Sequence, residues 1–301
     1  MRGLLLRAGL LLADGMVRVL PSRPAYALAD LCGRAWYRLA PRRRALVSQS
    51  LARVCAATGR PTDPRSTRAM VRRAFVNHAR YYLELLRAPH YPADRLDRYV
   101  TADDWEHLEP ILRQGVVIAS LHQGNFEPFG HLLAAHGLHA VAPVEEIRPR
   151  ELFEFLLARR GGGITTGEIE IIPLSRSRRR LVDALRNGDI AALIADRDLD
   201  GDGIPVTMFG HATTLPTGPA VLALLTDRPL LVAACLRAGP DRFRGRAAPI
   251  EVERSGDRRA DTEALTLAMG RWFEEAIGAA PEQWWGAFQP YWTDQRRGAG
   301  S

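Results

Sequence analysis

The chain has 301 residues, of which 47% are hydrophobic and 25% are charged, and its formal net charge is +7 at pH 7. A chain of this length and composition can bury a sizeable core, so a disordered tail, a collagen-like repeat and a disulfide-stabilised scaffold are excluded. The three cysteines, Cys32, Cys55 and Cys235, lie far apart and form no CxxC pair. This spacing argues against a zinc ribbon and favours a reducing compartment.

All 41 basic residues are arginines. A positive surface attracts phosphate, whether on an anionic lipid, on a phosphopantetheine or nucleotide donor, or on nucleic acid. The sequence has no zinc finger, no RNP-like motif and no basic stretch interleaved with aromatic residues. We therefore expect no nucleic-acid partner.

The first twenty residues are rich in leucine, but Arg7, Asp14 and Arg18 interrupt them. No apolar run reaches the ~18 residues that a membrane span needs. Ala25-Tyr26-Ala27 resembles a signal-peptide cleavage site, yet the helical patterns that follow directly favour a retained amphipathic helix. Such a helix lies in a membrane interface or packs on its own domain, and the sequence leaves both open.

Residues 1 to about 110 are predicted as a helical N-terminal layer, with helices near 25–40, 42–58 and 65–88 separated by prolines. After Gly115, short continuous apolar runs alternate with helical patterns, which is typical of strands buried on both faces of a largely parallel sheet. The strands are predicted at 116–121, 140–144, 169–174, 190–195 and 230–236. The helices between them are predicted at 125–137, 150–160, 176–187 and 216–227.

A further strand or hairpin is predicted at 242–253 and a last helix at 261–278. We find no internal repeat and no long linker, so residues 1–301 are predicted to form a single domain. Its α/β core spans 111–295 and has a mixed, largely parallel central sheet flanked by helices.

Ligands of open α/β sheets bind at the carboxyl ends of the strands, and the strand at 116–121 leads into His122. Glu127 follows five residues later, in the first turn of the next helix, where a carboxylate could orient the imidazole and stabilise its cation. The motif His-x4-Glu is weak by itself, because a surface histidine beside a helix-capping glutamate has the same spacing.

The strand at 190–195 leads into an acidic loop that starts at Asp196 and continues Arg-Asp-Leu-Asp-Gly. This resembles the start of a calcium loop, but Thr207 occupies the position of the required bidentate glutamate, so we do not expect calcium. The spacing of His122, Glu127 and His131 is compatible with a metal site, but ordinary helix and loop positions are favoured. We therefore expect no metal.

Four segments carry a family resemblance: His122-Gln-Gly-Asn-Phe-Glu127, Asp196-Arg-Asp198, Gly203-Ile-Pro-Val-Thr-Met-Phe-Gly210 and Leu215-Pro-Thr-Gly-Pro-Ala220. Over about residues 10–295 their order and spacing resemble the bacterial lipid A biosynthesis acyltransferase family, within the lysophospholipid acyltransferase superfamily. The resemblance implies a glycerolipid acyltransferase-like fold.

The C-terminal stretch Trp285-Gly-Ala-Phe-Gln-Pro-Tyr-Trp292 is similar to that of the actinobacterial phosphatidylinositol mannoside acyltransferases. The lipid A lauroyl and myristoyl transferases usually have a more basic ending there. The resemblance therefore favours the mannoside branch, although that branch usually has glutamate at the position of Asp196.

This resemblance implies transfer of a long-chain fatty acyl group from a thioester to a sugar hydroxyl of a membrane glycolipid, most closely a phosphatidylinositol mannoside. His122 corresponds to the general base and Asp196 to its carboxylate partner, while Glu127 either orients His122 directly or holds the site together. The implied substrate-binding positions are Asn125, Glu145, Arg159, Arg197, Asp198 and Asp202.

The expected partners are an acyl thioester donor (acyl-CoA or acyl carrier protein), a glycolipid acceptor and the cytoplasmic face of the cell membrane, where the protein is expected to be peripheral. No cofactor is expected. A lipid A-type transferase that uses acyl carrier protein, and a non-catalytic lipid-binding protein on the same fold, remain open alternatives.

A sugar hydroxyl stays protonated near neutral pH, and a histidine with an unperturbed pKa of ~6.5 can remove its proton during attack. The sequence has no G-x-S-x-G motif and its cysteines lie outside the motifs, which favours direct attack without an acyl-enzyme. Backbone N–H groups near Gly124, or at the helix start near Pro216, could stabilise the oxyanion. Arginines at the start of another helix could bind donor phosphates; they are Arg176, Arg178, Arg179 and Arg180.

Overall fold

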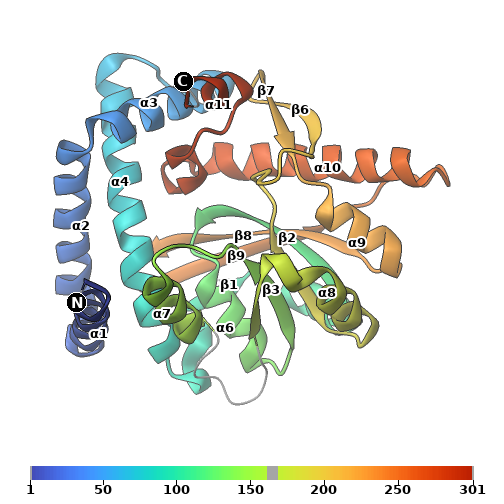
Figure 1. The fold of residues 1–301 in the computed structure, drawn as a ribbon, viewed down its shortest axis with the longest axis horizontal. Helices are drawn as coiled ribbons and strands as arrows, with labels where there is room; N and C mark the ends of the chain where they lie inside the picture. The colour runs from blue at the N-terminus through green and yellow to red at the C-terminus, as the bar shows by residue number, and fades with distance from the viewer. Residues whose placement is uncertain (1, 161–168, 300–301) are drawn as a thin grey trace.

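The computed structural model describes residues 2–160 and 169–299. Its central sheet has seven strands in the order β1-β9-β8-β2-β5-β3-β4 (Figure 1). The strands are β1 (Val100–Ala102), β2 (Val116–Gly124), β3 (Ala140–Val144), β4 (Ile169–Pro173), β5 (Ile190–Ile194), β8 (Leu230–Gly239) and β9 (Arg242–Pro249). All neighbouring pairs are parallel except β8 and β9. The prediction of a mixed, largely parallel sheet is confirmed.

The two faces of the sheet are covered by different helices because successive side chains of a strand point to opposite faces. On one face, Val117, Ala119 and Leu121 of β2 pack in the main core with α3, α4, α8, α9 and α10. On the other face, Val116 and Ile118 pack with α5 and α6. The helices of these two layers are α5 (Trp105–Leu112), α6 (Glu127–Ala135), α8 (Ser177–Arg186), α9 (Gly218–Thr226) and α10 (Arg258–Ala279), while α7 (Arg150–Arg160) contacts α1, α4 and β4.

Four helices precede the sheet: α1 (Arg2–Val19), α2 (Ser22–Leu39), α3 (Pro41–Ala57) and α4 (Pro64–Arg87). In Figure 1, α2 and α4 stand side by side at one end of the sheet, with α1 at their foot. The longest of them, α4, starts where the side chain of Asp63 accepts hydrogen bonds from the backbone N–H groups of Arg65 and Ser66.

The predicted helical layer extended to about residue 110, but the structure places β1 inside that range. Val100 pairs with Phe243 of β9, so this segment belongs to the sheet. A strand of three residues at a sheet edge is too short to show a periodic pattern, which explains the error.

A second, two-stranded sheet is formed by β6 (Ile204–Met208) and β7 (His211–Leu215), which pair antiparallel. The chain then ends in the short helical turns η4 (Pro281–Gln283) and η5 (Trp285–Phe288) and in α11 (Thr293–Ala299). None of the helices in the described residues is both long and apolar enough to cross a membrane.

Candidate active site

The site begins where the regular pairing of β2 is interrupted. The register of β2 against β8 shifts between Ser120 and Gly124, and Gly124 adopts a φ of +59°. A side chain at Gly124 would also clash with the carbonyl group of Cys235, so both the conformation and the space require glycine. This irregularity leaves the His122 side chain partly exposed at the carboxyl end of β2.

The neighbouring strand β5 brings a carboxylate to the same place. Ser120 pairs with Ile194, so two residues further along both strands His122 lies opposite Asp196. The Nδ1 atom of His122 lies 2.6 Å from Oδ1 of Asp196, and Asp196 is completely buried. Two segments 74 residues apart therefore form a hydrogen-bonded histidine–aspartate pair.

A tryptophan holds the second oxygen of this carboxylate. The indole Nε1 of the fully buried Trp284 donates to Oδ2 of Asp196 at 3.0 Å. Burial alone would raise the pKa of Asp196, but the charge and hydrogen bond of His122 and the hydrogen bond of Trp284 hold the pKa below its ordinary value of 3.8. Asp196 is therefore ionised near neutral pH and accepts the Nδ1 proton of His122, which leaves Nε2 as the basic nitrogen.

The residues after Trp284 complete the wall around the pair. The Trp285 ring packs edge-on against His122, with ring centroids 4.5 Å apart. A side chain at Gly286 would clash with the Trp284 ring and lie 3.0 Å from Oδ2 of Asp196, so glycine permits this close packing. Sequence reasoning did not assign Trp284 to the site; its one indication is that a buried indole N–H needs an acceptor.

Asn125 and Glu127 are hydrogen-bonded to each other and to residues of α4. The fully buried Asn125 accepts a hydrogen bond from the backbone N–H of Glu127 at 3.0 Å and donates to Glu84 at 3.2 Å. The buried Asn125 side chain therefore joins the turn between β2 and α6 to α4. The half-buried Glu127 carboxylate accepts a hydrogen bond from Tyr81 at 3.5 Å.

Two backbone donors in this turn are already used. The N–H of Asn125 donates to the carbonyl group of Cys235 at 2.8 Å, and that of Glu127 donates to the side chain of Asn125. Neither is therefore free to stabilise an oxyanion.

The remaining predicted substrate-binding residues, apart from Arg159, lie in the loops around the carboxyl ends of the strands. Glu145 is exposed directly after β3, and Arg197 is half-buried directly after Asp196. Asp198 accepts hydrogen bonds from the backbone of Gly201 and Gly203, so it shapes its own loop. Asp202 is exposed in that loop. Arg159 lies on α7, and its side chain is outside the described part of the structure.

The described residues contain no group of three or more histidines, cysteines and carboxylates that could hold a metal ion. The histidine at position 131, considered above for such a group, is buried on α6, and burial lowers its pKa to about 4.

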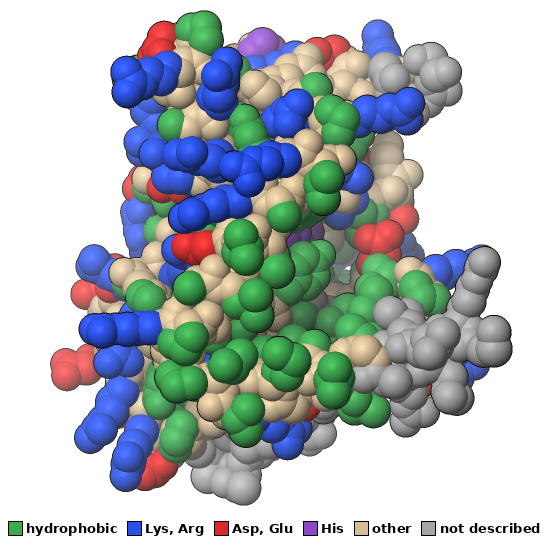
Figure 2. All heavy atoms as spheres, turned by 90° about the vertical axis from the view of Figure 1, so that its left-hand side faces the viewer, with side chains coloured by type: hydrophobic (Ala, Val, Ile, Leu, Met, Phe, Trp, Pro, Cys, Tyr) green, Lys and Arg blue, Asp and Glu red, His purple; other side chains and the backbone are tan. Residues whose placement is uncertain are grey.

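An apolar groove of about 450 Å³ lies between α2 and α4. Aromatic rings connect this groove to His122. The Trp285 ring that packs against His122 also contacts His78, and His78 stacks on Tyr82, which lines the groove. On this face of the molecule, Figure 2 shows apolar side chains gathered around a hollow in which histidine is visible. The other lining residues are Ala25, Leu28, Ala29, Cys32, Trp36, Ala79 and Leu83.

A histidine base oriented by a buried carboxylate at the carboxyl edge of an α/β sheet defines a site for taking a proton from a nucleophile. The family model of the bacterial lipid A biosynthesis acyltransferases matches residues 8–293. The chain therefore belongs to this family and is an acyltransferase, as the four motifs predicted.

Curated relatives come from mycobacteria. The chain is 33% identical over 229 residues to the phosphatidylinositol mannoside acyltransferase of Mycobacterium tuberculosis (strain ATCC 25618 / H37Rv), covering 72% of this chain and 68% of the relative. It is 30% identical over 239 residues to the phosphatidylinositol mannoside acyltransferase of Mycolicibacterium smegmatis, covering 76% of this chain and 75% of the relative.

Proposed function

We propose that this acyltransferase moves a long-chain fatty acyl group from acyl-CoA to a sugar hydroxyl of a phosphatidylinositol mannoside. The names of its mycobacterial relatives support the acceptor. The observation that carries the chemistry is the 2.6 Å contact between Nδ1 of His122 and the buried Asp196, because a proton on Nδ1 that is shared with the carboxylate assigns Nε2 as the nitrogen that accepts a proton.

In the proposed reaction, Nε2 of His122 removes the proton of the sugar hydroxyl while the hydroxyl oxygen attacks the thioester carbonyl carbon. Asp196 stabilises the imidazolium that forms. The tetrahedral intermediate then expels the thiolate, which takes the proton from His122, so that an ester and a free thiol result. A general base of this kind contributes about 10²–10⁴ in rate.

The surroundings of the pair support the proposed substrates. The apolar groove is suited to an acyl chain, because burial of each methylene contributes about 0.8 kcal/mol. We assign contacts with the polar substrate groups to Glu145, Arg159, Arg197, Asp198 and Asp202, which follow or lie near the ends of the strands.

Arginines near the carboxyl end of β4 support a phosphate-bearing donor. Arg176 and Arg178 are exposed there; Arg179 is also exposed but lies 3.7 Å from Asp183, and Arg180 is paired with Glu170. The pantetheine thioesters of coenzyme A and of acyl carrier protein both carry phosphate. These arginines are therefore compatible with either donor, and the assay below compares the two.

Exposed apolar side chains support peripheral attachment to the cytoplasmic face of the membrane. On α1 and α2 they lie beside arginines, a combination that binds the surface of an anionic bilayer. These side chains are Leu11, Leu12, Met16, Val19, Leu28, Leu31 and Leu39.

The test is an assay of the purified protein with acyl-CoA or acyl carrier protein as donor, and with a phosphatidylinositol mannoside or a lipid A precursor as acceptor. Mass spectrometry identifies the product. We expect an acylated mannoside from acyl-CoA, and a loss of about 10²–10⁴ in kcat for His122→Ala. Replacement of His107, which is exposed on α5, serves as the matched control. Turnover of the lipid A precursor alone, or full activity of His122→Ala, contradicts the proposal.

A further inference from the structure

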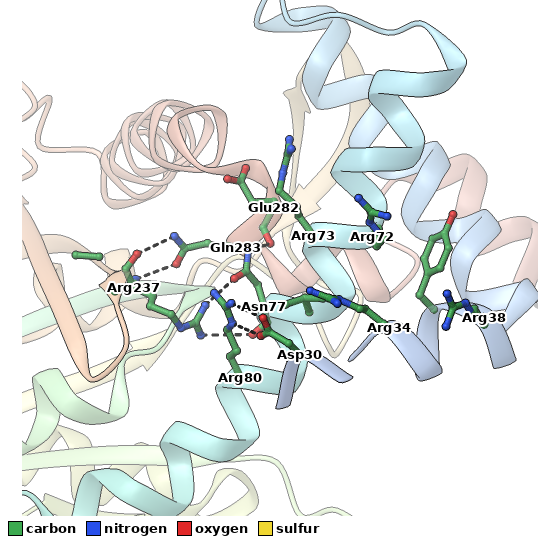
Figure 3. Close-up of a pocket in the computed structure, with 14 residues that line it drawn as sticks. Asp30, Arg34, Arg38, Arg72, Arg73, Asn77, Arg80, Arg237, Glu282 and Gln283 are labelled. Atoms are coloured by element: carbon green, nitrogen blue, oxygen red, sulfur yellow. Dashed lines mark hydrogen bonds and ion pairs between the residues drawn. The ribbon is translucent and has the colours of Figure 1, made fainter. Parts of the chain in front are cut away.

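A second, larger pocket lies on the other side of the α2–α4 pair. It has a volume of about 770 Å³, and six arginines line it together with only two carboxylates, Asp30 and Glu282 (Figure 3). Its α2 residues are Asp30, Arg34, Tyr37 and Arg38, which follow helical spacing on one face of that helix. The apolar groove uses other α2 residues, so the two sites open on different sides of the helix.

Two of the six arginines are neutralised by partners. Arg80 forms an ion pair with Asp30 at 2.6 Å, and Arg237 forms a buried ion pair with Glu84. The other four are exposed and form no ion pair with any of the described residues; they are Arg34, Arg38, Arg72 and Arg73. Their mutual repulsion in a concave site is relieved by a bound anion, because low-dielectric walls strengthen the local potential.

The base of the pocket is held in place by hydrogen bonds. The side chain of Gln283 accepts from the backbone N–H of Arg237 at 2.8 Å and donates to its carbonyl group at 3.1 Å. The guanidinium of Arg237 donates to Asn77 at 2.9 Å. A ligand therefore meets a preorganised base and, along α2 and α4, the side chains of four exposed arginines, and guanidinium matches the oxygen geometry of phosphate.

We propose that this pocket binds a phosphate-bearing ligand through Arg34, Arg38, Arg72 and Arg73, separately from the acyl-transfer site. The phosphate is carried by a soluble organic phosphate or by the headgroup of an anionic phospholipid, which share this chemistry. The volume accommodates more than a single ion, in the range of small-molecule sites.

The test compares two variants with the same change in charge. Arg34→Gln combined with Arg72→Gln alters the pocket, whereas Arg258→Gln combined with Arg259→Gln alters two exposed arginines at the start of α10. Binding of inorganic pyrophosphate is measured by calorimetry. Binding to phosphatidylcholine vesicles is measured by sedimentation with and without phosphatidylinositol.

A soluble ligand is supported if pyrophosphate binds and only the pocket variant binds about tenfold or more weakly, the effect of losing one or two charge-assisted hydrogen bonds. A lipid headgroup is supported if pyrophosphate fails to bind but only the pocket variant loses its preference for phosphatidylinositol vesicles. Equal weakening in both variants, or no binding of either probe by the unaltered protein, overturns the proposal.

A second measurement uses the unaltered protein. Phenylglyoxal modifies arginine, and mass spectrometry reports the modification at each position. The successful probe should protect the pocket arginines Arg34, Arg38, Arg72 and Arg73 while leaving Arg258 and Arg259 reactive. Uniform protection, or none, contradicts a defined site. Neither measurement requires acyl transfer, so its result is independent of the proposed reaction.

Discussion

Trp284 donates its indole N–H to the one oxygen of Asp196 that His122 does not use. The two hydrogen bonds fix the carboxylate from both sides inside the core. Because Trp284 is fully buried and contacts Asp196, it acts as a positioning residue. It holds the carboxylate that orients the imidazole of His122.

We predict that Trp284→Phe lowers kcat by about 10- to 100-fold and leaves KM nearly unchanged, because a buried charged acceptor loses a hydrogen bond of about 1.5–3 kcal/mol. The measurement is steady-state kinetics with the acceptor identified by the assay above. Trp272→Phe is the matched control, since the indole N–H of the buried Trp272 has no hydrogen-bond partner among the described residues. Equal effects of the two substitutions would contradict the role of Trp284.

The two carboxylates near His122 should differ strongly in importance. We predict that Asp196→Asn lowers kcat by about 10³–10⁴, because the neutral amide no longer stabilises the imidazolium or selects its tautomer. Glu127→Gln should have a much smaller effect, since Asp196 is the carboxylate hydrogen-bonded to Nδ1 of His122. Kinetics of both variants at one pH decide the matter, and a larger loss in the Glu127 variant would reverse the assignment.

Two buried histidines make stability depend on pH. Burial, with a smaller contribution from the charges of Arg43 and His122, lowers the pKa of His78 to about 3, and burial lowers that of His131 to about 4. Between these values and 6.5 the unfolded chain binds protons that the folded chain does not. The contribution of these neutral histidines to the free energy of unfolding is therefore complete above pH 6.5. It is lost as the pH falls below 6.5, by about 1.4 kcal/mol per pH unit for each histidine.

Urea unfolding at a series of pH values measures this slope. His78→Phe places an apolar ring among the surrounding aromatic rings and should remove the share of His78, so that the free energy of unfolding falls less steeply below pH 6.5. An unchanged slope in this variant would show that protonation of His78 is not linked to unfolding.

The buried ion pair between Glu84 and Arg237 should be costly to break. Arg237→Met leaves the Glu84 charge buried and unpaired, and we expect a loss of about 3–5 kcal/mol in the free energy of unfolding. Adding Glu84→Gln should recover part of it. As a control, Arg150→Met breaks an exposed pair with Glu154 and should cost less than about 1 kcal/mol. A loss equally small in both variants would contradict this assignment.

Membrane attachment can be tested on the exposed face of α2. Leu31 and Leu39 are 62% and 81% exposed, so changing both to serine should leave folding intact but weaken partitioning to anionic vesicles about tenfold or more. Val221→Ser combined with Leu225→Ser, on α9, removes two other exposed apolar side chains as a control. Vesicle sedimentation measures the effect, and unchanged partitioning would exclude α2 from the contact.

The sequence predicted the elements whose pattern is local. The runs that became β2, β3 and β5 are continuous and apolar because the sheet is covered on both faces. The strand β1 and the final helix α11 were missed, since each is very short and contacts residues distant in the chain: Val100 pairs with Phe243, and Gln295 of α11 donates to Ser50.

The same distinction holds within the site. Strand ends indicated His122 and Asp196 as candidates, but the choice between Asp196 and Glu127 depends on the register of β2 against β5, which no single segment contains. Trp284 contacts a residue 88 positions away, so nothing local reveals it. The catalytic roles themselves remain predictions until the variants above are measured.

The run from Glu282 to Trp285 has one further consequence. Its first two residues line the larger pocket, the one with six arginines, and its last two contact Asp196 and His122. Inserting or deleting a single residue there would displace the lining of the larger pocket and the tryptophans beside His122 and Asp196 at the same time. An engineer who exchanges this segment between related enzymes therefore has to transfer all four residues as a unit, with the length unchanged.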